Sequence, residues 1–164
     1  MVQHMKRKVL IIVLAAAAVF ALCNVLWFAW SHIRYGKFSG GMEKAEFSNF
    51  ATPHYIYTDT DRYDYLVKYP DYLSFTGNMS VGLPAADENL FTDALIIWPK
   101  PGGRYELGVL LYDVDGSGYS VYIDSEGNAL SKEDEEVVSW HRENIRDLLK
   151  KADEKWGITH NQAR

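Results

Sequence analysis

Residues 105–124 have the sequence YELGVLLYDVDGSGYSVYID, in which two alternating apolar runs flank a short acidic segment rich in glycine. Alternation of apolar, β-branched and aromatic residues predicts one strand on each side of this segment. Gly116 and Gly118 can supply positive φ angles, and Asp113 and Asp115 can hydrogen-bond to nearby amides. The stretch therefore predicts a β-hairpin. If Asp113–Gly118 form the connection, Tyr112 faces Tyr119 and Gly108 faces Ile123.

The segment DVDGSGYSVYID also has the residue spacing of a calcium-binding loop, with oxygen-bearing side chains at positions one, three, five and twelve. A loop of that class lies between two helices, whereas strands are expected here on both sides. The hairpin places Asp124 across from Leu107, far from the turn. Asp113, Asp115 and Ser117 then remain as candidate metal ligands, sufficient for weak binding only.

Other stretches with strand character lie near this hairpin and are joined to it by short connections. They are Tyr63–Tyr69, residues 77–84 and Asp93–Pro99. Short connections favour antiparallel neighbours. We therefore expect an α+β fold with an antiparallel meander of about four or five strands.

The C-terminal segment changes to a helical period. Ser131 and Asp134 are spaced as in a capping box, and Gly157 is a typical stop. The expected apolar face consists of Val137, His141, Ile145, Leu148, Ala152 and Trp156. This amphipathic helix is expected to pack on the sheet.

The N-terminal stretch Val9–Trp30, VLIIVLAAAAVFALCNVLWFAW, contains a single strongly polar residue, Asn24. As a helix it would be about 33 Å long, enough for a hydrocarbon core of about 30 Å. Aromatic residues gather at its end, as at a membrane interface. The apolar run is longer than that of a cleavable signal peptide, so we expect an uncleaved membrane anchor.

These features divide the chain into a basic cytoplasmic tail (1–8), a transmembrane anchor (9–30), a juxtamembrane tether (31–44) and a soluble α+β domain (45–164). The basic cluster at residues 6–8 favours a cytoplasmic N-terminus, which places the domain outside the cytoplasm. Cys23 lies in the anchor, so the domain has no disulfide.

The expected domain is strongly acidic. Residues 1–37 hold five of the 17 Lys and Arg residues and none of the 22 Asp and Glu residues, so the remainder has 12 basic and 22 acidic residues and a net charge of −10. Such a charge repels phosphates, and a nucleic-acid partner is not expected.

Motifs of hydrolases, nucleotide-binding proteins and zinc enzymes are absent from the sequence. His141 falls on the apolar helix face, where a hydrogen-bonded structural role is expected. No catalytic residue and no cofactor is predicted. The 11 tyrosines are expected mainly to pack on the sheet, with a possible interaction face formed by Tyr63, Tyr65, Tyr69, Tyr119 and Tyr122.

The leading hypothesis is a non-enzymatic, single-pass membrane protein whose acidic extracytoplasmic domain contacts a protein or peptide, as an accessory subunit, sensor, inhibitor or immunity-type protein. Alternatives are a calcium-dependent module using the turn Asp113–Gly118, an envelope enzyme with dispersed catalytic residues, and a pilin-like subunit.

Overall fold

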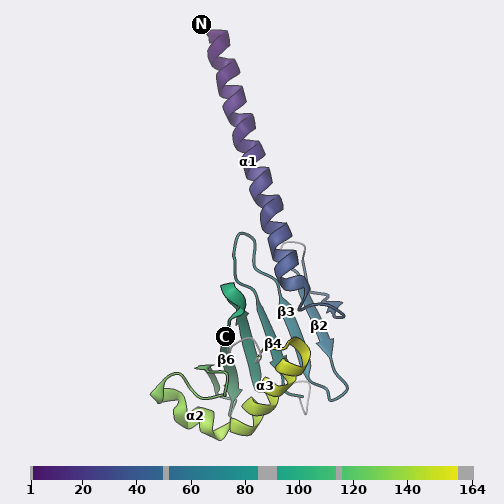
Figure 1. The fold of residues 1–164 in the computed structure, drawn as a ribbon, viewed down its shortest axis with the longest axis vertical. Helices are drawn as coiled ribbons and strands as arrows, with labels where there is room; N and C mark the ends of the chain where they lie inside the picture. Colours follow the sequence, from purple (N-terminus) through teal and green to yellow (C-terminus); the bar gives the residue numbers. More distant parts are fainter. Residues whose placement is uncertain (1, 50–51, 85–91, 114–115, 159–164) are drawn as a thin grey trace. The chain divides into compact units, whose positions relative to one another are not determined.

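The structure is a computed structural model that describes residues 2–49, 52–84, 92–113 and 116–158, with side chains from residue 6 onward. The chain divides into two compact units, Met1–Lys37 and Phe38–Arg164. Figure 1 shows the long helix of the first unit and the sheet and helices of the second.

The first unit consists of helix α1, Val2–Gly36. Among the described residues, one helix is long and apolar enough to cross a membrane, over Lys6–Gly36, and its apolar stretch is not buried. The Asn24 Nδ2 donates a hydrogen bond to the Phe20 carbonyl oxygen at 2.8 Å, which lowers the cost of this amide in an apolar medium. By length and composition, α1 fits a membrane anchor or a signal sequence.

Within the described ranges, the second unit contains a seven-stranded antiparallel sheet in which each strand pairs with the next along the chain. The strands are β1 (Glu43–Lys44), β2 (His54–Thr58), β3 (Asp64–Lys68), β4 (Asn78–Gly82), β5 (Ala94–Pro99), β6 (Tyr105–Tyr112) and β7 (Gly118–Ile123). A short 3₁₀ turn, η1 (Pro101–Gly103), precedes β6. The predicted α+β meander is confirmed, with more strands than the four or five expected.

The additional strands are β1 and β2. The sequence of β2, HYIYT, is rich in residues that favour strands, but it is short and lies outside the clear alternating runs. Strand β1 has two residues and falls in the segment 31–44, for which a tether was expected. In the structure, β1 pairs with β2 and β2 pairs with β3. These pairings identify both segments as strands.

One face of the sheet is covered by helix α3 (Arg142–Trp156), which packs on β4 and β5 (Figure 1). Because side chains alternate along a strand, every second residue points into this interface. The buried residues include Val67, Met79, Val81, Leu95, Ile97, Val109 and Leu111 from the sheet and Ile145, Leu148 and Ala152 from α3. This layer is the core of the second unit.

The hairpin of β6 and β7 is present, but its register differs by one residue from the prediction. Tyr112 pairs with Gly118 and Leu111 with Tyr119, whereas Tyr112 was expected opposite Tyr119. Gly118 belongs to β7 rather than to the connection. A shift of one residue exchanges the two faces of a strand, so the predicted ladder through Tyr112 and Gly108 is wrong, and Leu111 lies on the buried face instead.

The C-terminal helix is divided into the 3₁₀ turn η2 (Lys132–Asp134), α2 (Glu135–Trp140) and α3. The break is at His141, whose φ of −101° and ψ of 13° are not helical. The Ser131 hydroxyl accepts a hydrogen bond from the Glu133 N–H. Gly157 ends α3 with a φ of 64°, as the sequence predicts.

Candidate binding groove

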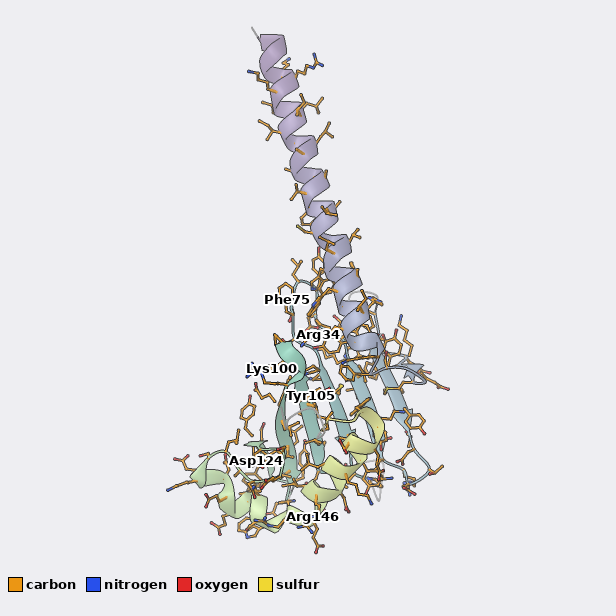
Figure 2. All side chains as sticks on the ribbon, in the orientation of Figure 1. Arg34, Phe75, Lys100, Tyr105, Asp124 and Arg146 are labelled. Atoms are coloured by element: carbon orange, nitrogen blue, oxygen red, sulfur yellow. The ribbon has the colours of Figure 1, made fainter. Side chains whose placement is uncertain are left out.

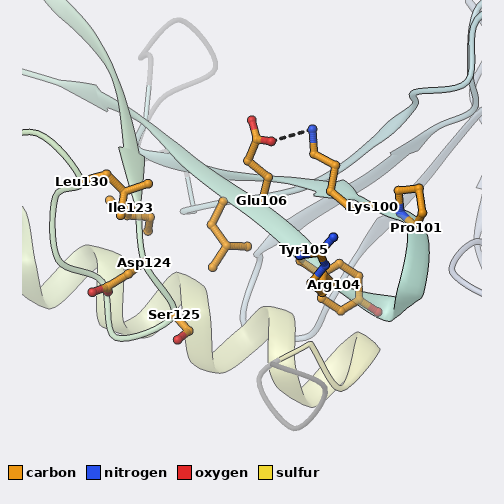
Figure 3. A pocket seen from close by; sticks show the side chains of 10 residues that line it. Lys100, Pro101, Arg104, Tyr105, Glu106, Ile123, Asp124, Ser125 and Leu130 are labelled. Carbon is orange, nitrogen blue, oxygen red and sulfur yellow. Dashed lines mark ion pairs between the residues drawn. The ribbon is translucent and has the colours of Figure 1, made fainter. Parts of the chain in front are cut away.

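A groove of about 590 Å³ lies between the start of β6 and the segment that follows β7. Its lining residues are Lys100, Pro101, Arg104, Tyr105, Glu106, Leu107, Ile123, Asp124, Ser125 and Leu130. Figure 3 shows these side chains on the two sides of the groove. The antiparallel pairing of Leu107 with Ile123 brings the two segments together. This volume is within the usual range for ligand pockets, roughly 300–1,000 Å³.

The groove has apolar walls and an uneven distribution of charge. Leu130 is exposed and its N–H donates to the Tyr122 carbonyl oxygen at 3.0 Å, which extends the edge of the sheet beyond β7. Lys100 and Glu106 neutralise each other through an ion pair at 2.5 Å. Arg104 is exposed and forms no ion pair with any residue in the described part of the chain. A cation is therefore available at one end of an apolar groove.

At the other end of the groove, the carboxylate of Asp124 forms hydrogen bonds within the turn of residues 124–128. It accepts hydrogen bonds from the N–H groups of Glu126 and Asn128 and from Asn128 Nδ2, at 2.8, 2.9 and 3.0 Å. Partial burial raises the pKa of this carboxyl, but the bonds from Asn128 outweigh it and leave the pKa below its ordinary value. Asp124 therefore shapes the groove and is a poor candidate for acid–base chemistry.

A buried polar network joins the start of β5 to the helices. Asp93 accepts hydrogen bonds from the Tyr112 N–H at 2.8 Å and from Asn144 Nδ2 at 2.7 Å. His141 Nδ1 lies 2.7 Å from the same carboxylate. His141 thus has the structural, hydrogen-bonded position that the sequence predicts.

A second cluster fixes the middle of α3 to the turn between β2 and β3. Lys151 forms ion pairs with Asp59 at 3.1 Å and with Asp61 at 2.5 Å, and the Tyr65 hydroxyl donates to Asp59 at 3.2 Å. Partial burial raises the pKa of the Asp59 carboxyl, but the Tyr63 N–H and the Lys151 ammonium outweigh it and leave the pKa lowered. The same contacts, first with Asp61 and then with Asp59, raise the pKa of Lys151.

This cluster predicts a pH-dependent contribution to stability. Because the pKa of Asp59 is lower in the folded chain, its contribution is present above the unfolded pKa of about 3.9 and is lost as the pH falls through the folded value. We expect Asp59→Asn to lower the melting temperature at pH 7 and to have a smaller effect at about pH 2.5. Thermal melts of both proteins at the two pH values measure this. An equal difference at both pH values would contradict the assignment.

The five tyrosines of the predicted interaction face do not form one surface. Tyr65 and Tyr69 are buried, and the Tyr65 ring contacts Trp156 edge to face at 5.7 Å between centroids. Lys151 lies over the Tyr63 ring at 4.7 Å. Tyr119 and Tyr122 are exposed but lie three residues apart in β7 and so on opposite faces. Packing therefore accounts for Tyr63, Tyr65 and Tyr69.

Tyr122 belongs to the face of the sheet opposite α3. Its ring lies 5.8 Å from that of Trp98 on β5. Between them on β6 is Gly108, where a Cβ atom would come within 3.0 Å of the Trp98 ring. The absence of a side chain at Gly108 thus allows the two aromatic rings to meet above the strand.

Of the candidate metal ligands, Asp113 and Ser117 are described and Asp115 lies outside the described residues. The Asp113 N–H donates to the Ser117 carbonyl oxygen at 2.9 Å, and the Gly116 N–H donates to the Asp113 carbonyl oxygen at 2.9 Å. The backbone of this turn is closed by its own hydrogen bonds. Among the described residues, no group of three His, Cys, Asp or Glu side chains could hold a metal ion.

The groove was not predicted from the sequence. Its residues come from two segments without a motif, 100–107 and 123–130. The predicted hairpin already places these segments side by side, so strand pairing was the signal available in the sequence. It did not indicate that Arg104 forms no ion pair with another described residue. Comparisons with protein families, with curated proteins and with solved structures find no match.

Proposed function

We propose that this chain is a single-pass membrane protein whose second unit lies outside the cytoplasm and binds a protein or peptide segment in the groove between β6 and residues 123–130. The observation that carries the proposal is a groove of about 590 Å³ with the Arg104 guanidinium at one end, which forms no ion pair with the residues that the structure describes. Helix α1 supports membrane attachment through its length and apolar composition.

The lining indicates the kind of segment that would fit. Tyr105 and Leu130 offer apolar contacts, and Arg104 offers a planar cation that pairs well with carboxylates. An extended segment that carries an apolar side chain next to an acidic group matches both features. Since the domain as a whole has a net charge of −10, Arg104 would have to provide the attraction locally, at a site where the paired Lys100 and Glu106 cancel each other.

Site-specific photo-cross-linking in intact membranes tests the proposal. We expect a photoreactive amino acid at Leu130 to form an adduct with a defined partner, because this side chain is exposed at the groove. The same probe at Ser117, exposed in the β6–β7 turn and outside the groove, is the control.

Arg104→Glu is expected to reduce the Leu130 adduct about tenfold or more, because a lost charge-assisted contact and a new repulsion together exceed 1.4 kcal/mol. Arg104→Lys should retain part of the adduct. Adducts of equal yield at Leu130 and Ser117, or an adduct unaffected by Arg104→Glu, would remove the groove as the binding site.

A further inference from the structure

The beginning of the second unit is fixed at one end of the sheet. The Phe38 carbonyl oxygen accepts a hydrogen bond from Trp156 Nε1 at 3.0 Å, and the Phe38 ring contacts the Tyr105 ring at the start of β6. The Ser39 hydroxyl lies 3.0 Å from the Tyr69 hydroxyl, one residue after the end of β3. Since Phe38 follows the last residue of α1, Gly36, by two positions, this end of the sheet is covalently close to the end of the apolar helix.

The same end of the sheet carries the loop between β3 and β4, residues 69–77. Three large side chains on this loop are exposed: Tyr72 by 44%, Leu73 by 56% and Phe75 by 67%. Figure 2 shows Phe75 at one end of the second unit and Arg146 at the other. Exposed apolar side chains that lie together often mark a surface that contacts a protein or a membrane, whereas single exposed ones are common on any protein.

The acidic residue of the loop is neutralised by neighbouring groups. Asp71 pairs with Lys68 at 3.1 Å and accepts a hydrogen bond from the Thr52 hydroxyl at 3.1 Å. The contact with Lys68 holds the pKa of the Asp71 carboxyl below its ordinary value. In a unit of net charge −10, the exposed apolar tip of this loop therefore carries no unpaired carboxylate.

The backbone of the loop is strained at its most apolar point. Leu73 has a φ of 62°, which is uncommon for a bulky residue other than glycine and costs about 1–3 kcal/mol. A hydrogen bond from the Ser74 N–H to the Asp71 carbonyl oxygen, at 2.7 Å, spans this residue. In this conformation the Leu73 side chain is largely exposed to solvent. Its burial in the protein therefore does not offset the cost of the strained backbone.

We propose that this loop, through Tyr72, Leu73 and Phe75, inserts into the interfacial region of the membrane leaflet from which α1 emerges. The inference rests on the proposed function, since it requires α1 to span the membrane. Tyr72 suits this region because its apolar ring carries a polar hydroxyl, and Leu73 and Phe75 supply apolar surface for the acyl boundary. The loop is then a second attachment point, which limits rotation of the domain about α1.

The dimensions of the chain agree with such insertion. The helix continues from Trp30, the last residue of the predicted span, to Gly36, a rise of about 9 Å. A nine-residue loop can project about 13 Å from the ends of its strands, with four residues outward, one at the tip and four returning. The reach of the loop therefore exceeds the rise of the helix beyond the predicted span. A protein partner on the same loop is the alternative that the experiment must exclude.

Depth-dependent fluorescence quenching of the full-length protein in phosphatidylcholine vesicles tests the inference. Cys23, the natural cysteine, is replaced by serine, and a polarity-sensitive fluorophore is attached through Phe75→Cys. The control is Thr60→Cys, an exposed position in the β2–β3 turn at the opposite end of the sheet. We expect a blue shift of about 10 nm or more at Phe75 relative to Thr60, and quenching several times stronger by nitroxide-labelled lipids.

Leu73→Cys should behave as Phe75→Cys does. If the protein floats with the vesicles but the label at position 75 has the same spectrum as the label at position 60, loop insertion is wrong and membrane attachment through α1 still holds. Protein that does not float with the vesicles would overturn the proposed membrane attachment itself. Because the vesicles contain no other protein, a signal at Phe75 identifies lipid rather than a protein partner.

Discussion

Replacement of Leu148 by alanine is expected to lower the free energy of unfolding of the second unit by about 2–5 kcal/mol. Leu148 is 0% exposed and lies on the face of α3 that packs on β4 and β5. The loss combines the transfer energy of the deleted carbon atoms with the cost of a cavity between helix and sheet. Denaturant unfolding of the full-length protein in detergent, followed by tryptophan fluorescence, measures the change.

The matched control is Leu130→Ala. Leu130 is 66% exposed, and the same deletion there should change the stability by no more than about 0.5 kcal/mol. Similar losses for the two variants would mean that α3 is not packed on the sheet as described. Leu130→Ala also separates stability from binding, since it should weaken binding in the groove while the fold is retained.

Replacement of Asp93 by alanine is expected to cost about 3–5 kcal/mol, the usual range when one partner of a buried charged contact is removed. Asp93 is 4% exposed. Without its carboxylate, the Tyr112 N–H and the Asn144 amide lose their acceptor. Asn144 is exposed and its amide can turn to water, whereas a shielded donor left without a partner costs about 1–3 kcal/mol. The same unfolding experiment measures the loss.

Asp93→Asn should cost less, because its remaining carbonyl oxygen can still accept one of these bonds. Glu126→Ala removes a carboxylate from an exposed turn and leaves the backbone N–H of this residue in place, so it serves as the control, with an expected change within about 0.5 kcal/mol. If Asp93→Ala were as mild as Glu126→Ala, the network with His141 and Asn144 would not stabilise the fold. A double-mutant cycle of Asp93 with Asn144 gives their coupling directly.

The sequence was informative where periodicity is strong. The alternation in Tyr105–Tyr112 and the helical spacing through Ile145, Leu148 and Ala152 each follow from a buried face, so both elements were predicted. Gly157 was predicted because few other residues adopt its φ of 64° without strain. Each of these features depends on a few neighbouring residues, so a short stretch of sequence is enough to predict it.

Other features depend on contacts that local patterns do not contain. The register of β6 and β7 is decided by whether Gly118 belongs to the turn, and the hydrogen bond of the Asp113 N–H to Ser117 O fixes that choice. The break at His141 accompanies its contact with Asp93, 48 positions earlier in the chain. The groove likewise requires residues from two sides of a hairpin. That Arg104 forms no ion pair with another described residue follows from its surroundings in the fold, which the local sequence does not contain.

The order of the strands has a consequence for how the chain acquires its structure. Since every strand of the sheet pairs with its predecessor, each pairing closes only a short length of chain, which keeps the entropic cost of closure small and favours rapid folding. During synthesis, a strand can join the growing sheet as soon as it emerges. Helix α3, which packs on β4 and β5, is made after the seven described strands, so the apolar face of the sheet stays uncovered until α3 has been made.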